Sequence, residues 1–163
     1  MTTVVVYYSG YGHTKVVAER VAEGANASLI AIDNNGDIQE SDWQQLNEAK
    51  TIIFGAPTYM GGVPWQFKKF ADATSKPWFS RAWQDKLFAG FSNSASLNGD
   101  KQLSLQYLQT LASQQRGIWI SLGMPTANTQ AATSQDINNH GGTLGLLVQP
   151  PSGAGGEATA SAD

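Results

Sequence analysis

Residues 4–14 read Val-Val-Val-Tyr-Tyr-Ser-Gly-Tyr-Gly-His-Thr, and this stretch decides the fold. The run Val4–Tyr8 contains only β-branched and aromatic residues, which is typical of a strand buried on both faces of a parallel sheet. The turn Ser9–Thr14 contains two glycines and leads into a predicted helix that ends at about Ala25. A buried strand, a glycine-rich turn and a helix in this order predict the start of an α/β fold.

The rest of the chain continues to alternate between strands and helices. Further strands are predicted at 28–33, 51–55, 87–92 and 118–122, and a short apolar run occupies 144–148. Helices are predicted at 41–49, where Ser41 and Gln44 form a capping box, at about 64–74 and at 100–114. Crossovers as long as a helix predict a five-stranded, doubly wound parallel sheet with helices on both faces.

Composition excludes several classes of function. The 163 residues contain 10 Lys and Arg against 13 Asp and Glu, a net charge of −3, which argues against a nucleic-acid-binding protein and a polybasic membrane-binding patch. The absence of cysteine excludes disulfides, zinc–thiolate sites and thiol nucleophiles, and two histidines are too few for a multi-histidine metal site. No apolar run approaches the ~20 residues of a membrane span, and the N-terminus does not resemble a signal peptide. We therefore expect a cytoplasmic protein without a metal and without membrane insertion.

The first loop is a candidate phosphate site, because ligands of open α/β sheets bind at the carboxyl ends of the strands. In Ser9–Thr14, two glycines allow a tight turn, two hydroxyl groups are available, and a helix begins. The amides and the positive dipole end of a helix N-terminus bind phosphate without Lys or Arg. The alternative is an ordinary turn in which Ser9 or Thr14 only caps the helix.

The same loop partly matches a dinucleotide-binding fingerprint, through Gly10, Gly12 and Asp33 near the end of the second strand. However, Lys15 stands where the third glycine is required, and five strands leave no second mononucleotide-binding half. No Gly-Lys-Ser/Thr follows, so the loop is not a P-loop either. The sequence favours a mononucleotide.

The loops after the third and fourth strands suit the rest of such a ligand. Ala56–Gly62 places an aromatic residue beside two glycines, as a flat ring with hydrogen-bonding edges requires. Asn93–Gly99 is rich in hydroxyl and amide groups, as a polyol chain requires. Each loop taken alone could be an ordinary connection or a solvated loop. Together the three loops describe a phosphate, a hydroxylated chain and a planar heterocycle, which is flavin mononucleotide (FMN).

The order of elements resembles the flavodoxin-like fold, with strand order 2-1-3-4-5. Within it, Ser9–Thr14, Gly55–Gly61 and His140–Gly145 resemble the NAD(P)H:quinone oxidoreductases of the tryptophan-repressor-binding-protein (WrbA) type, and the resemblance covers about residues 3–149. It implies an FMN enzyme that accepts hydride from NADH or NADPH and reduces a quinone-like acceptor. A flavodoxin that carries single electrons between proteins, or a flavin-binding regulatory domain, is the alternative.

The resemblance also implies which residues form the site. The first loop would hold the phosphate, the second would flank the isoalloxazine, and the third would line the ribityl chain and the pyrimidine edge. The implied cofactor-binding residues are Ser9, Gly10, Tyr11, Gly12, His13, Thr14, Pro57, Thr58, Tyr59, Met60, Gly61, Asn93, Ser94, Ala95, Ser96 and Gly99. No catalytic side chain is expected, because the flavin carries the chemistry.

Two residues are implied at the substrate side. Tyr11 would lie near the nicotinamide donor, and Trp78 matches a tryptophan that family members lend to the flavin pocket of a neighbouring subunit. This implies a homo-oligomer, a dimer or a tetramer, with a core or hinge tryptophan as the alternative for Trp78. The remaining tryptophans, Trp43, Trp65, Trp83 and Trp119, are expected to be packing residues.

The chain departs from the family pattern in two places. Relatives often carry a histidine near the flavin where this chain has Gln115, which affects redox tuning or substrate preference. The domain is predicted to end near residue 150, and 151–163 reads as an unstructured tail of small residues. Relatives continue there with a last helix, so we expect the natural chain to extend by about one helix, with Asp163 as its N-cap.

Overall fold

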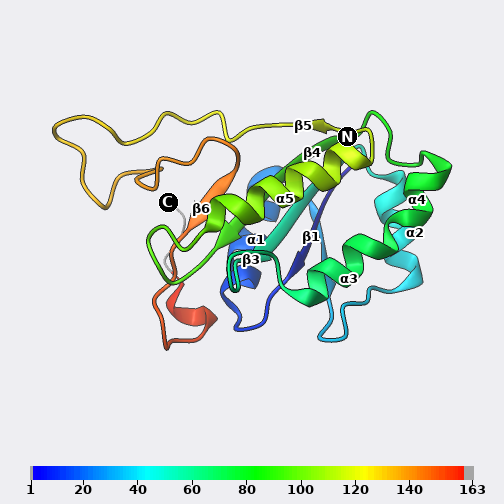
Figure 1. Cartoon of the computed structure of the whole chain (residues 1–163), viewed down its shortest axis with the longest axis horizontal. Helices are drawn as coiled ribbons and strands as arrows, with labels where there is room; N and C mark the ends of the chain where they lie inside the picture. Colours follow the sequence, from blue (N-terminus) through cyan, green and yellow to red (C-terminus); the bar gives the residue numbers. More distant parts are fainter. Residues whose placement is uncertain (1, 160–163) are drawn as a thin grey trace.

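A parallel β-sheet runs through the middle of the molecule, with helices on both of its faces (Figure 1). The structure is a computed structural model that describes residues 2–159. Its strands are β1 Thr3–Tyr8, β2 Ser28–Ile32, β3 Thr51–Pro57, β4 Leu87–Asn93, β5 Ile118–Trp119 and β6 Leu146–Val148. The sheet order β2-β1-β3-β4-β5, with all pairs parallel, confirms the predicted flavodoxin-like topology.

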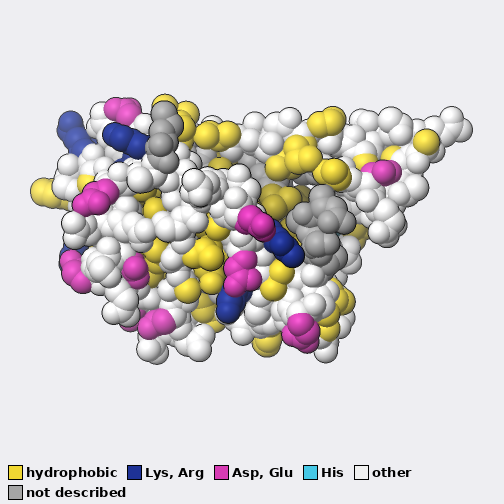
Figure 2. Space-filling view, turned by 180° about the vertical axis from the view of Figure 1, so that it is seen from behind, with side chains coloured by type: hydrophobic (Ala, Val, Ile, Leu, Met, Phe, Trp, Pro, Cys, Tyr) yellow, Lys and Arg dark blue, Asp and Glu magenta, His cyan; other side chains and the backbone are white. Residues whose placement is uncertain are grey.

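Strand β1 is buried on both faces, as its sequence predicts. Val4 and Val6 belong to the larger core, which lies under the helices α2 Glu40–Glu48, α3 Trp65–Ala73 and α5 Lys101–Gln114. Val5 and Tyr7 lie on the opposite face, in a smaller core with the helix α1 His13–Ala25. On that face a groove remains between α1 and the sheet, and hydrophobic side chains are visible across the middle of the molecule (Figure 2).

The fifth strand is split, which corrects the predicted strand at 118–122. β5 ends at Trp119 and pairs with the start of β4, and the chain then leaves the sheet until β6, which pairs with the end of β4. The two ends of the connection between β5 and β6 are held together, because Trp119 Nε1 donates a hydrogen bond to the Leu144 carbonyl at 2.9 Å. At the return point, a Cβ on Gly145 would lie 2.3 Å from the Gly90 carbonyl oxygen, so β6 can approach β4 only with glycine there.

Two local expectations about the helices also change. Helix α2 begins at Glu40, so Ser41 lies inside the helix, and Asp42 accepts a hydrogen bond from the Gln39 amide in place of the predicted Ser41–Gln44 box. A short helix, α4 Ser75–Ser80, was not predicted, and it includes Pro77 in its first turn, where proline is tolerated. No helix among residues 2–159 is long and apolar enough to cross a membrane.

The C-terminal segment Pro150–Thr159, which we call the strap, returns to the start of α1. Its 3-10 helix, η1 Gly156–Ala158, packs so closely that a Cβ on Gly156 would lie 2.8 Å from the Gly12 carbonyl oxygen. The His13 ring Nδ1 lies 2.6 Å from the Thr159 hydroxyl oxygen. The expectation of an unstructured tail is therefore wrong up to Thr159. Residues 160–163, with the expected N-cap Asp163 and any helix after it, lie outside the described residues.

Candidate cofactor site

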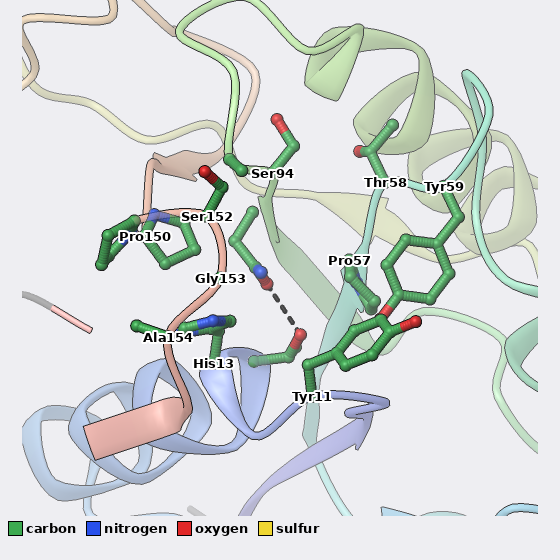
Figure 3. A pocket seen from close by; sticks show the side chains of 14 residues that line it. Tyr11, His13, Pro57, Thr58, Tyr59, Ser94, Pro150, Ser152, Gly153 and Ala154 are labelled. Atoms are coloured by element: carbon green, nitrogen blue, oxygen red, sulfur yellow. Dashed lines mark hydrogen bonds between the residues drawn. The ribbon is translucent and has the colours of Figure 1, made fainter. Parts of the chain in front are cut away.

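A cavity of about 540 Å³ lies at the carboxyl ends of β1, β3 and β4 (Figure 3). The three loops that the sequence singled out form three of its walls, and the strap forms the fourth. Tyr11 and Tyr59 lie together at one side, and Pro150, Ser152 and Ala154 lie at the other. The complete lining is Tyr11, His13, Thr14, Pro57, Thr58, Tyr59, Asn93, Ser94, Ala95, Pro150, Pro151, Ser152, Gly153 and Ala154.

The first loop offers backbone amides to this cavity. Gly12 precedes α1 with a φ of 91°, a left-handed conformation that favours glycine. The Lys15 amide donates to Ser9 Oγ at 3.1 Å, and the amide of the next residue donates to the Gly12 carbonyl. The amides of His13 and Thr14 have no acceptor within residues 2–159. Because no Lys, Arg, Asp or Glu lines the cavity, these amides and the α1 dipole are its features suited to an anion.

Asn93 joins the three loops into one unit. Its side-chain oxygen accepts a hydrogen bond from the Thr14 hydroxyl at 2.7 Å, and its carbonyl accepts one from the Thr58 amide at 2.9 Å. The Thr58 hydroxyl in turn lies 2.9 Å from Ser92 Oγ and 2.7 Å from Ser104 Oγ. Thr14 is 1% exposed, and its hydroxyl donates its only hydrogen to the side-chain oxygen of Asn93. A direct contact between this hydroxyl and a phosphate stays a prediction.

A pair of tyrosines separates the cavity from a second one of about 450 Å³. The rings of Tyr11 and Tyr59 meet edge to face with centroids 5.9 Å apart. Burial, and then the neighbouring Tyr8 and Tyr11, raise the pKa of Tyr59 to about 12, so its phenol stays protonated at neutral pH. The second cavity is lined by Tyr8, Gly10, Tyr11, Tyr59, Met60, Val63, Pro64, Trp65 and Gln66.

Comparison with known proteins places the chain in a family. Residues 8–137 match the model of the NADPH-dependent FMN reductase family. The chain belongs to this family. It is 64% identical over 160 residues to flavodoxin FldP of Pseudomonas aeruginosa (strain UCBPP-PA14), and the match covers 98% of this chain and 87% of that protein.

Two further relatives carry names that bear on the function of this FMN reductase family member. The crystal structure of a WrbA-like flavodoxin from Agrobacterium tumefaciens has a TM-score of 0.75 and 60% identity, and the match covers 85% of this chain and 89% of that one. An NAD(P)H dehydrogenase (quinone) of Azorhizobium caulinodans is 30% identical over 120 residues, and the match covers 62% of this chain and 60% of that protein. The relatives thus include both a named flavodoxin and a named quinone dehydrogenase.

The residues present fit FMN. The amides at the start of α1 suit its phosphate, and the hydroxyl and amide groups of Asn93, Ser94 and Ser152 suit a polyol. Pro57 and Tyr59 offer flat, largely apolar surfaces to a ring. The volume also falls within the range of about 300–1,000 Å³ that is usual for cofactor pockets.

The predicted site residues fall into three groups. Nine of them line the first cavity: Tyr11, His13, Thr14, Pro57, Thr58, Tyr59, Asn93, Ser94 and Ala95. Gly10 and Met60 line the second cavity, which Tyr11 and Tyr59 also border. The rest line neither of the two and lie in the loops around them: Ser9, Gly12, Gly61, Ser96 and Gly99.

Trp78 and Gln115 lie away from both cavities. Trp78 is on α4, which lies at the opposite end of the molecule from the strap (Figure 1), and the Arg116 guanidinium sits 5.6 Å from the centroid of its ring. Gln115 is buried and donates through Nε2 to the hydroxyl and carbonyl oxygens of Thr74. Within one chain, neither residue therefore reaches the candidate cofactor site.

Two further findings were not foreseen from the sequence. Trp65, which we expected to be a packing residue, is 61% exposed at the second cavity, whereas Trp83 is fully buried. The strap residues 150–154 were missed as part of the site. Their signal was the pair Pro150–Pro151, which follows the apolar run 144–148 after one residue and restricts the direction that the chain can take after β6.

The Thr159→Val variant tests whether the strap retains the cofactor. It removes the hydroxyl beside the His13 ring and keeps the side-chain shape. We expect FMN to dissociate about tenfold faster, because one net hydrogen bond contributes about 0.5–1.5 kcal/mol and 1.4 kcal/mol is a tenfold change. The release is followed by the recovery of flavin fluorescence. Thr110→Val removes a comparable hydroxyl, which donates to the Gln106 carbonyl in α5, and serves as the control; equal rates for both variants would show that the strap does not hold the cofactor.

Proposed function

We propose that this protein is an FMN-dependent oxidoreductase that transfers electrons from NADH or NADPH to a quinone-like acceptor. The observation that carries the proposal is the first cavity, in which helix-start amides, a polar wall and an aromatic wall surround one space of the right size. The match to the NADPH-dependent FMN reductase family and the quinone dehydrogenases among the relatives support it.

The chain's own residues bind and orient the cofactor in this proposal. The loop Ser9–Thr14 holds the phosphate, Asn93–Ala95 together with the strap line the ribityl chain, and Pro57–Met60 flank the isoalloxazine. Bound FMN supplies the redox chemistry, as acceptor of a hydride and donor of electrons to the second substrate. In the same proposal Tyr11 contacts the nicotinamide donor, which its 74% exposure and its position at the border of both cavities support.

Steady-state turnover tests this proposal. Purified FMN-loaded protein is mixed with NADH or NADPH, with and without benzoquinone, and nicotinamide oxidation is followed by absorbance. We expect oxidation that depends on both the protein and the quinone. Protein that retains FMN but oxidises neither nucleotide would contradict the enzymatic function and leave FMN binding intact.

A one-electron carrier is the second candidate, because the relative with 64% identity is named a flavodoxin. A carrier docks on partner proteins, and electrostatic docking benefits from a strongly charged surface, whereas the net charge here is −3. A redox titration separates the two candidates. The enzyme should take up two electrons in one step, and a carrier should take them up in two well-separated one-electron steps.

We further propose a homo-oligomer in which Trp78 contributes to the site of a neighbouring subunit. Trp78 is 42% exposed and the adjacent Phe79 is 85% exposed, so the end of the molecule that carries α4 presents aromatic surface that another copy could cover. Trp78→Ala should lower quinone turnover about tenfold, the effect of losing roughly 1.4 kcal/mol of transition-state binding, and should leave FMN retention nearly unchanged. Size-exclusion chromatography should show an oligomer. A monomer with full activity would contradict the shared site.

A further inference from the structure

Lys101 is a buried cation at the centre of the loop that follows β4. It is the first residue of α5, and its side chain is 0% exposed. Its ammonium donates hydrogen bonds to Ser94 Oγ at 3.1 Å, to the Ser96 carbonyl at 2.7 Å and to the Leu97 carbonyl at 2.9 Å. All three acceptors belong to one loop, and Ser94 also lines the cofactor cavity. The ammonium therefore lies directly behind the cavity wall.

The charge of Lys101 has no negative partner in the part of the chain that the structure describes. No carboxylate there lies within ion-pair distance of its ammonium. A cation at a helix N-terminus is also disfavoured by the helix dipole. Burial lowers the pKa of Lys101, and burial together with the charge of Lys101 lowers the pKa of His140, so the nearby imidazole is neutral at pH 7. Buried charges without a partner are rare and costly, so a nearby anion would stabilise this arrangement.

The loop around the ammonium is tightly wound. Gly99 and Asp100 both have left-handed backbone conformations, with φ of 55° and 53°. A Cβ on Gly99 would lie 1.8 Å from Ser94 Oγ, so this close approach requires glycine. Ser96 and Gly99, which were predicted as cofactor ligands, thus act on the shape of the loop, and Ser94 and Ala95 form the wall itself.

We propose that Lys101 is a positioning residue that holds the cofactor-binding loop in shape from behind, and that its buried charge makes the site favour reduced over oxidised FMN. The inference rests on FMN occupying the first cavity. Oxidised FMN already carries a negative phosphate, and two-electron reduction with uptake of one proton adds a further negative charge on the ring system. A fixed positive charge behind the wall stabilises that added charge more than it stabilises the oxidised ring.

The chain provides a matched control in Lys86, which directly precedes β4, the strand that leads into the loop around Lys101. Lys86 is 8% exposed, and its ammonium donates to the carbonyls of Asn47 and Ala49, the first at 2.7 Å. Burial, and to a lesser extent the charge of Lys50, lowers the pKa of Lys86 as well. It precedes Leu87, whereas the cavity lies beyond Asn93 at the other end of β4. Removing either lysine leaves buried acceptors unsatisfied, but only Lys101 lies beside the cavity.

The experiment compares wild type, Lys101→Met and Lys86→Met. Affinity for oxidised FMN is measured by fluorescence quenching, the midpoint potential of bound FMN by anaerobic redox titration, and stability by thermal unfolding without FMN. For Lys101→Met we expect oxidised FMN to bind about tenfold more weakly and reduced FMN about a hundredfold more weakly, so that the potential falls by about 30 mV for this two-electron couple. For Lys86→Met we expect lower stability but an unchanged affinity and potential.

The outcomes separate the two parts of the proposal from each other and from FMN binding itself. Equal weakening of oxidised and reduced FMN would overturn the role of the charge, and unchanged FMN affinity would overturn the role in loop shape. An equal effect of Lys86→Met would show that only general destabilisation is measured. If Lys101→Met does not fold, Lys101→Gln keeps a donor without the charge, and the fall in potential is expected in it too. A wild-type protein that binds no FMN would instead contradict the cofactor site.

Discussion

Replacing Gly12 by alanine is expected to weaken FMN binding about a hundredfold, which corresponds to roughly 2.8 kcal/mol. Gly12 has a φ of 91°, and a non-glycine residue held in such a region costs on the order of 1–3 kcal/mol. The added Cβ would also lie 3.2 Å from the backbone nitrogen and Cα of Gly156 in the strap. The substitution therefore disturbs the phosphate-binding amides and the fourth wall together.

The control is the same substitution near the other end of α1. A Cβ added to Gly24, within the helix, would meet no atom within 4 Å, so Gly24→Ala should stabilise the protein by about 0.5–1 kcal/mol without affecting FMN. Isothermal titration with FMN and with riboflavin completes the test, because riboflavin lacks the phosphate. Gly12→Ala should weaken FMN much more than riboflavin. Equal losses for the two ligands would contradict the phosphate site at the start of α1.

Asn93→Ala is expected to lower FMN affinity by about ten- to a hundredfold and to reduce stability. It removes the acceptor of the Thr14 hydroxyl, and a buried polar group without a partner costs about 1–3 kcal/mol. The first loop would then lose its side-chain connection to β4. The variant is measured by FMN titration and by thermal unfolding of the protein without cofactor.

Asn47→Ala is the control, because it removes a comparable hydrogen-bond acceptor at the opposite end of the sheet from the cavity. The side-chain oxygen of Asn47 accepts a hydrogen bond from Trp83 Nε1 at 2.8 Å, and Trp83 is fully buried. We expect a similar loss of stability and an unchanged FMN affinity. If the two variants weaken FMN equally, Asn93 contributes to the fold alone and not to the arrangement of the three loops.

Most of the sheet could be predicted because each strand carries its own signal. Val4–Tyr8 is buried on both faces, and the alternation with helices predicted the doubly wound parallel sheet. The order of its strands was implied by the resemblance to the flavodoxin-like fold. Three loops at the carboxyl ends were identified from composition, and the structure brings residues of all three around one cavity. Local patterns and the topology rule for α/β sheets were sufficient for this part of the site.

The remaining features depend on contacts that leave no local pattern. His13 and Thr159 are 146 positions apart, and the strap consists of small residues that resemble a linker in composition. The division of the fifth strand depends on how closely Gly90 and Gly145 approach, which periodicity does not encode. Trp65 was predicted to be a packing residue from its residue type, yet it is exposed beside the second cavity.

The proposal that FMN in the first cavity is reduced by a nicotinamide nucleotide is tested most directly by anaerobic mixing. FMN-loaded protein is mixed with NADH and, separately, with NADPH, and the flavin absorbance is followed in a stopped-flow instrument. We expect the flavin absorbance to bleach in a single two-electron phase with at least one of the two nucleotides. Flavin that is reduced by dithionite but stays oxidised with both nucleotides would contradict the proposed function.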